Sequence, residues 1–140
     1  MDPLLKKLNF KEGMKIQIWN CPEELKALEK EWKSMGLLAK EFDHPDFLLG
    51  FVLSEEEIRV LFNQMKPQLQ KDEIFWIAYP KKSSKRYQVS INRDKGWKAL
   101  GDQGYEGVRQ VSINEDWSAL RWRNVKFIKN MTRKFSAKDQ

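Results

Sequence analysis

The stretch 46–80 constrains the fold more than any other part of the chain. Two apolar runs flank a segment of different periodicity, in the order 46–53, 54–65 and 73–79. The apolar runs are nearly continuous and too short for typical helices, a pattern typical of strands buried on both faces of a parallel sheet. In the middle segment, Ser54 and Glu57 have the spacing of a capping box. Its apolar residues recur at helical spacing: Ile58, Leu61, Phe62 and Met65. A strand, a crossover helix and a parallel strand make a βαβ unit with a right-handed crossover.

A second strand and helix are predicted before this unit. The alternating run 14–19 indicates a strand. The helix after it is expected to have Asn20 or Cys21 as its cap and Pro22 at its first position. It is expected to end at Gly36. Its predicted buried stripe is Leu25, Leu28, Trp32 and Met35.

Residues 37–42 are predicted to be a loop or a short edge excursion rather than a strand. Only Asp43, His44 and Pro45 separate them from the strand that begins at Asp46. A parallel neighbour needs a crossover of about a dozen residues or more, so this connection is too short.

The last part of the chain is predicted to close the sheet with a hairpin. A basic loop follows residue 80, and Asn92 is expected to cap a short helix that runs through Leu100. Two alternating runs joined at Glu115 and Asp116 indicate the hairpin. We therefore expect one three-layer α/β domain over 1–123. Its mostly parallel sheet would consist of 14–19, 46–53 and 73–79, with an antiparallel hairpin of 108–114 and 117–123.

Charge is distributed unevenly along the chain. The net charge is +6, but residues 1–80 hold 11 Lys/Arg against 14 Asp/Glu, whereas residues 81–140 hold 15 against 6. A half with a net charge of +9 can mark a face for anions, nucleic acid or acidic partners. The alternative is a solvated surface that serves solubility. The basic tail 124–140 is expected either to form an amphipathic helix or to stay loose. Its apolar positions could dock on a protein partner, on a second copy of the chain or on the domain itself.

Several functional classes are excluded by composition. One cysteine allows no internal disulfide, and one histidine with one cysteine makes no zinc site, so we expect no metal. The longest uncharged apolar run, 47–53, is too short to span a bilayer. No apolar segment of a signal peptide is visible at the start. Together these features predict a cytoplasmic protein that does not enter a membrane.

The order of the predicted elements is similar to the class I methyltransferase variant of the Rossmann fold. Residues 65–77 resemble the Leu-Lys-Pro…Gly-Gly passage into the fifth strand of that fold, with Asp72 and Glu73 in place of the glycines. The chain also resembles a small bacterial family catalogued only as a domain of unknown function. The matching pieces are 20–23, 76–81, 92–97 and 111–123. This resemblance covers about residues 8–123 and implies a truncated Rossmann-like fold without a known activity.

Two departures from the methyltransferase pattern bear on function. The loop after the first strand, 19–24, contains no glycine, although a cofactor loop needs glycines so that its backbone can approach the ligand. The carboxylate that would hold a ribose belongs to a second strand that is not expected here. We therefore predict a non-enzymatic binding or interaction module that uses no cofactor. The first alternative is a divergent S-adenosylmethionine- or nucleotide-dependent transferase.

The carboxyl edge of the sheet is the predicted ligand site, because ligands of open α/β sheets bind outside the carboxyl ends of the strands. Cations and a helix N-terminus at this edge would suit phosphate, carboxylate or a nucleotide. A solvated lysine and serine loop is the alternative. The predicted site residues are Asn20, Cys21, Ser54, Tyr79, Lys81, Lys82 and Arg93.

Cys21 is expected to be a cap or packing residue rather than a nucleophile. A helix N-terminus can lower a thiol pKa, but Glu23 and Glu24 beside Cys21 raise it. The one histidine, His44, is expected in a surface turn at the opposite end of the sheet. No catalytic residue is therefore predicted.

The closing hairpin supports a second alternative, nucleic-acid binding. Trp117, Arg121 and Arg123 interleave an aromatic ring with guanidinium groups, a combination that stacks on bases and contacts phosphates. Alternation also places Leu120 and Trp122 on the other face, as in an ordinary amphipathic strand.

Overall fold

The computed structural model describes residues 2–128, and its centre is a five-stranded mixed sheet in the order β1-β2-β3-β5-β4. The strands are β1 Ile16–Trp19, β2 Phe47–Phe51, β3 Ile74–Pro80, β4 Tyr105–Ser112 and β5 Trp117–Asn124. The helices are α1 Pro3–Lys7, α2 Lys26–Ser34, α3 Glu55–Met65 and α4 Lys98–Gly101. Single 3₁₀ turns occupy Glu23–Leu25, Lys66–Gln68 and Val125–Phe127. The predicted tail lies outside the described residues from 129 onward.

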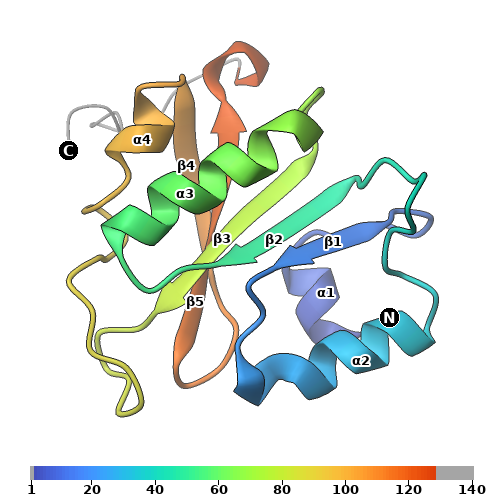
Figure 1. The fold of residues 1–140 in the computed structure, drawn as a ribbon, viewed down its shortest axis with the longest axis horizontal. Helices are drawn as coiled ribbons and strands as arrows, with labels where there is room; N and C mark the ends of the chain where they lie inside the picture. The colour runs from blue at the N-terminus through green and yellow to red at the C-terminus, as the bar shows by residue number, and fades with distance from the viewer. Residues whose placement is uncertain (1, 129–140) are drawn as a thin grey trace.

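The central βαβ unit forms as predicted. Strands β2 and β3 are parallel, and α3 connects them across one face of the sheet (Figure 1). Ser54 caps α3, because its side chain accepts a hydrogen bond from the Glu57 N–H at 3.1 Å. The Glu57 carboxylate in turn accepts from the Leu53 N–H at 3.1 Å. Both ends of the predicted capping box are therefore used, with the return bond one residue earlier than expected.

Residues 37–42 make one bridge and no strand, which agrees with the predicted edge excursion. Ile16 donates its N–H to the Leu37 carbonyl and accepts from the Ala39 N–H, both at 2.8 Å. The parallel bridge that these bonds form joins Ile16 to Leu38. The chain then turns back to β2 within a few residues, so no further pairing forms on this side of β1.

The sheet is mixed, and the prediction of a mostly parallel sheet was wrong. It has two parallel pairings, β1 with β2 and β2 with β3, and two antiparallel pairings, β3 with β5 and β5 with β4. Burial explains the order of the hairpin strands. Most of β5 is buried on both faces, which suits an interior position, whereas the middle of β4 is exposed and takes the edge.

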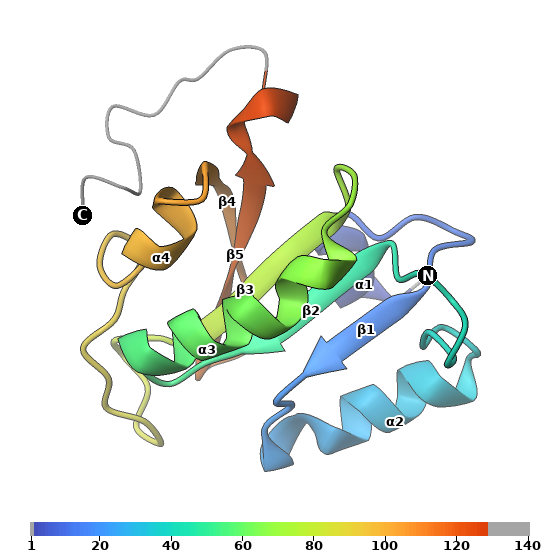
Figure 2. The same cartoon turned by 45° about the horizontal axis from the view of Figure 1, so that its top comes forward.

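Helices cover both faces of the sheet and create two apolar cores (Figures 1 and 2). Trp32 of α2 and Trp76 of β3 belong to the core on the α1 and α2 face. Phe62 of α3 and Trp97 belong to the core on the α3 and α4 face. The predicted alternation of β5 is confirmed, since Trp117 packs in the first core and Trp122 in the second.

The predicted start of the helix after β1 was wrong. Pro22 has an extended conformation, with ψ 154°, and precedes a 3₁₀ turn, so α2 begins only at Lys26. Asn20 and Cys21 lie before this turn and do not cap the helix. Met35, predicted to be buried, is 51% exposed because α2 ends at Ser34 and no longer points this residue at the sheet.

The predicted helix at Asn92 is also wrong. The Asn92 side-chain oxygen accepts from the Asp94 N–H at 2.8 Å and so closes a tight turn instead of capping a helix. The helix starts six residues later, at Lys98, and has only four residues. No helix N-terminus therefore points at Arg93. None of the helices in the described region has the length and apolar composition to cross a bilayer.

Candidate functional site

The residues predicted for one site at the carboxyl edge are divided between different places. Tyr79, Lys81, Lys82 and Arg93 line one groove of about 360 Å³. Asn20 lines a separate pocket of about 230 Å³. The predicted Cys21 and Ser54 line neither: Cys21 packs against the apolar core, and Ser54 caps α3.

Asn20 lies in the turn after β1, where a Rossmann fold would hold its ligand. Its φ of 59° is the left-handed conformation that glycine usually provides and that asparagine tolerates. Its side-chain amide donates to the Phe51 carbonyl at 3.5 Å and so connects the carboxyl ends of β1 and β2. The sequence shows that glycine is absent here, and the structure adds that the Asn20 side chain bonds across to the end of β2.

Tyr87 and Glu24 fill the space above that turn. The Tyr87 hydroxyl and the Trp117 indole N–H donate to the same Glu24 oxygen, at 2.6 and 3.0 Å. Burial tends to raise the pKa of the Glu24 carboxyl, but these two hydrogen bonds outweigh it and the pKa is lowered. Burial, reinforced by Glu24, raises the pKa of Tyr87 to about 12, so its hydroxyl remains a donor at neutral pH.

A second set of bonds holds the loop after β3 over this edge. Buried Ser84 donates to Asp116 at 2.8 Å and accepts from the N–H groups of Arg86 and Tyr87 at 3.2 and 3.1 Å. The Arg86 guanidinium lies 3.7 Å from Asp116. No local motif indicates the contact between Ser84 and Asp116, because the two residues are far apart in sequence.

The pocket that remains beside Asn20 is acidic. Its lining includes three carboxylates, those of Glu23, Glu24 and Glu57. At about 230 Å³ it is smaller than the roughly 300–1,000 Å³ of typical small-molecule sites. The predicted anion at Asn20 would meet negative charge in this pocket.

Cys21 has the properties of a packing residue. Burial, followed by the nearby Glu29 carboxylate, raises the pKa of its thiol to about 11. The thiol therefore stays protonated at neutral pH and is a poor nucleophile.

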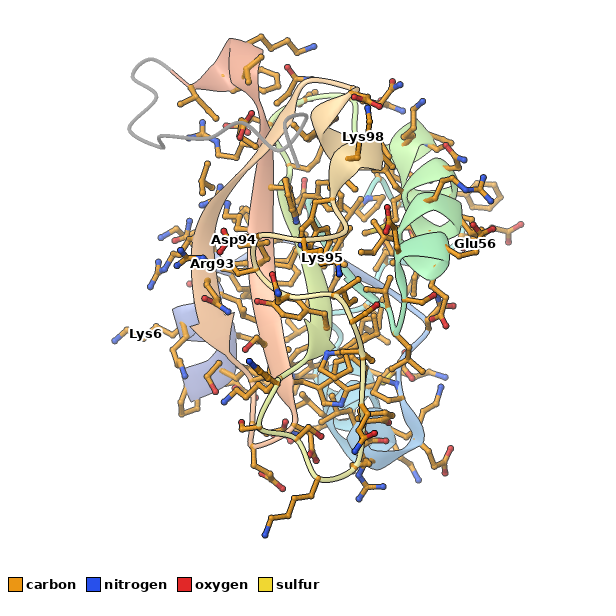
Figure 3. All side chains as sticks on the ribbon, turned by 90° about the vertical axis from the view of Figure 1, so that its left-hand side faces the viewer. Lys6, Glu56, Arg93, Asp94, Lys95 and Lys98 are labelled. Carbon is orange, nitrogen blue, oxygen red and sulfur yellow. The ribbon has the colours of Figure 1, made fainter. Side chains whose placement is uncertain are left out.

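The groove that contains the other predicted residues is basic. Lys81 and Lys82 follow β3, and Arg93 comes from the turn before α4. The remaining lining residues are polar, namely Tyr79, Ser83, Asn92, Gln110 and Ser118. No carboxylate is among these lining residues. Figure 3 shows Arg93 beside β4 and β5, whereas Lys95 of the same loop lies farther toward α3.

The floor of the groove is held by a short polar network. Tyr79 and Ser118 are cross-strand partners, and the Gln110 amide donates to the Tyr79 hydroxyl at 2.6 Å. Burial raises the pKa of Tyr79 to about 12, against the opposing effect of nearby Arg93. Lys81 donates to Ser112 at 2.6 Å, which fixes its ammonium group at the rim. Cations and neutral donors that share one hollow suit an anion that has several oxygens.

The predicted combination of an aromatic ring with guanidinium groups for nucleic-acid binding is not available on the surface. Trp117 is 1% exposed and its indole N–H is bound to Glu24, so the ring cannot stack on a base. Arg123 binds the Asp72 carboxylate at 2.6 Å, and Arg121 pairs with Trp76 across the sheet.

His44 is part of a network that the sequence did not indicate. Its Nε2 lies 2.7 Å from the carboxylate of Glu73, whose side chain is only 4% exposed. The same carboxylate accepts from the N–H groups of Gln70 and Lys71 at 3.2 and 2.7 Å. His44 therefore stabilises the turn before β3, at the end of the sheet opposite Cys21. Within residues 2–128, no group of three metal-binding side chains occurs.

Comparison with known proteins finds similarity at the level of architecture. No protein-family model matches the chain, and no curated protein is similar to it, so membership of the predicted bacterial family stays a prediction. A solved structure from Streptococcus agalactiae, described as a protein of the NADB-Rossmann superfamily, has 13% identity and a TM-score of 0.49. That match covers 89% of this chain and 68% of the other. The Streptococcus pneumoniae protein Sp1610, a candidate tRNA (m1A22) methyltransferase, has 14% identity and a TM-score of 0.45, over 87% of this chain and 58% of the other. Similarity this low carries no functional inference, and the Rossmann-like fold rests on the strand order and the parallel βαβ units.

Proposed function

We propose that the protein is a non-enzymatic binding module that takes a phosphate-type anion in the basic groove. The observation that supports this most strongly is that Lys81, Lys82 and Arg93 line one hollow without a carboxylate among its lining residues. The lysines and the arginine come from segments more than ten residues apart, so the groove is a product of the fold and not of a local charge run.

Phosphate fits this groove better than a carboxylate. A guanidinium can bind two phosphate oxygens at once, and an ammonium group acts as an additional point charge. The remaining oxygens would lie near the Tyr79 hydroxyl and the Gln110 amide on the floor. Arg93 has a competing contact to Asp94 at 3.6 Å, but both side chains are exposed and such pairs are weak.

The transferase alternative has less support because the cofactor cradle, the space above the turn 19–24, is reduced to a small acidic pocket. Asn20 joins the ends of β1 and β2, and Tyr87 with Glu24 fills the space above them. The proposed module accordingly uses neither S-adenosylmethionine nor a nucleotide as a cofactor.

Calorimetric titration with inorganic phosphate tests the proposal. The double variant Lys82→Gln/Arg93→Gln removes two cations from the groove. Since charge-assisted hydrogen bonds contribute about 1.5–3 kcal/mol each, it should bind phosphate at least about tenfold more weakly. Lys95→Gln is the matched control, because Lys95 lies on the same loop and does not line the groove. Equal binding by the double variant and the native chain would refute the proposal.

Thermal unfolding with S-adenosylhomocysteine tests the transferase alternative. Because only a small acidic pocket remains above the turn 19–24, we predict no shift in the unfolding temperature with this ligand. A shift with S-adenosylhomocysteine and none with phosphate would replace the proposed module with a divergent transferase.

A further inference from the structure

Three arginines of the hairpin lie on the opposite face of the sheet from the basic groove. Arg109 of β4 is the cross-strand partner of Arg121 of β5, and Arg121 is in turn the partner of Trp76 of β3. Trp76 belongs to the core on the α1 and α2 face, so Arg109 and Arg121 share that face. Arg123 follows two residues along β5, again on the same side.

The Arg109–Arg121 pair is unfavourable as it stands. Side chains directly opposite each other in an antiparallel pair have Cβ atoms only about 4.5–5.5 Å apart, and like charges there are destabilising. Within the described part of the chain, the side chains of Arg109 and Arg121 have no hydrogen bond and no ion pair, and their backbones pair in the sheet. The neighbouring carboxylates lie at the other end of the row, where Asp72 binds Arg123 and Glu106 is its cross-strand partner.

Arg121 carries a further sign of a missing anion. Its Nε is buried without a hydrogen-bond partner. Burial lowers the pKa of its guanidinium, and the Arg123 and Arg109 charges lower it further, against the opposing effect of the Asp72 carboxylate. A buried charged donor without a partner is costly and rare, so this group is expected to gain an acceptor from outside the described chain.

We propose that Arg109 and Arg121 bind the phosphate backbone of a single-stranded nucleic acid, with Arg123 at the end of the row. The two non-bridging oxygens of one phosphodiester can accept from two neighbouring guanidinium groups, whereas a planar carboxylate pairs best with one. The arginines line neither the basic groove nor the acidic pocket and follow the strand surface, which suits an extended polyanion. Both tryptophans of β5 are 1% exposed, so bases do not stack there and binding is independent of sequence.

Fluorescence anisotropy with a labelled single-stranded oligo(dT), titrated over a range of salt concentrations, tests this site. Affinity should fall as salt rises, since each phosphate contact on a single strand adds about 0.7 to the slope of log K against log salt. The variant Arg109→Gln/Arg121→Gln should reduce that slope by about 1.4, which corresponds to two lost contacts. The matched control is Lys30→Gln/Lys33→Gln, which removes the same charge from exposed positions of α2, outside both the groove and the arginine row, and should leave the slope unchanged.

Each remaining outcome decides the proposal. An equal loss in both double variants would show that binding follows net charge alone and would overturn the assigned site. Equal competition by polyglutamate would overturn the phosphate assignment in favour of an acidic peptide. Arg109→Gln alone, at an exposed position, repeats the test without disturbing half-buried Arg121 and should reduce the slope by about 0.7. Phosphate binding in the groove is measured separately, so either site can fail without the other.

Discussion

At the scale of single residues, Asn20 and Tyr87 determine the shape of the turn after β1 and of the small pocket beside it. The absence of glycine after β1 is visible in the sequence and indicated that this turn differs from a glycine-rich cofactor loop. The role of Tyr87 could not be predicted, because its partner Glu24 is 63 residues away. The division of the predicted site had the same cause: no local pattern shows which loop end meets which.

Replacing Tyr87 with phenylalanine tests the filled cradle. The variant keeps the ring that packs on Trp117 at 5.1 Å but loses the hydroxyl that binds Glu24. We expect the free energy of unfolding at pH 7, measured by urea denaturation, to fall by about 1–2 kcal/mol. Because the pKa of Glu24 is lowered in the folded state, its contribution exists above the ordinary carboxyl pKa and is lost as pH falls through the lowered value. The difference between the two proteins should therefore shrink below about pH 4. Equal stability at pH 7 would contradict this role.

The tyrosine hydroxyls give a second prediction at this scale. The chain has three tyrosines, and burial raises the pKa of each one, with Tyr79 and Tyr87 at about 12. At about pH 10.5 the folded protein should show little phenolate absorbance, whereas urea-unfolded chain should be more than half ionised. A raised pKa stabilises the fold below the ordinary value and is lost as pH rises through the raised one, so stability should decline from about pH 10 upward. Half-ionised tyrosine in the folded protein at pH 10 would rule this out.

At the scale of elements, periodicity predicted the βαβ unit and the hairpin because both signals are local. The wrong predictions of helix starts concern residue types that occur both at helix starts and in turns. Pro22 and Asn92 suit helix starts and turns alike, and in both cases the chain uses the turn. The order of β4 and β5 in the sheet depends on how each strand is buried against strands that are distant in sequence. A short sequence pattern cannot predict this order.

The contact between β2 and α3 can be tested at Gly50. A Cβ at this position would lie 2.5 Å from Leu61 Cδ2 and 3.2 Å from the Met65 sulfur, both in the buried core. Gly50→Ala should therefore destabilise the protein by about 1–3 kcal/mol through overpacking. Gly13→Ala provides a comparison, because no atom lies near its Cβ and only its positive φ opposes the change. Unchanged stability in Gly50→Ala, measured by urea denaturation, would mean that α3 lies farther from the sheet.

The turn before β3 can be tested at Glu73, whose carboxylate binds His44 and two backbone N–H groups. Glu73→Ala removes the buried carboxylate that accepts these bonds and should lower the midpoint of thermal unfolding, with a loss of about 1.5–3 kcal/mol for bonds to a charged group. Glu73→Gln keeps one oxygen and should lose less. If both substitutions had equal and small effects, the network would not stabilise the turn.

At the scale of the whole molecule, the carboxyl edge of the sheet changes sign along its length. The pocket over β1 and β2 has three glutamates, whereas the groove over β3 and β5 has three cations. The charge asymmetry of the sequence anticipated the basic groove, since the C-terminal half holds 15 Lys/Arg against 6 Asp/Glu. The charge asymmetry did not predict that Asn20 would line the acidic pocket.

The most direct test of this account is amide chemical-shift mapping by NMR with inorganic phosphate and, separately, with S-adenosylhomocysteine. We predict that phosphate shifts the resonances of 81–83 and 92–93, which line the groove, and that S-adenosylhomocysteine shifts none. Shifts at 19–24 with S-adenosylhomocysteine, with 81–83 and 92–93 unaffected by phosphate, would contradict the central claim that the cradle is filled and the groove binds the anion.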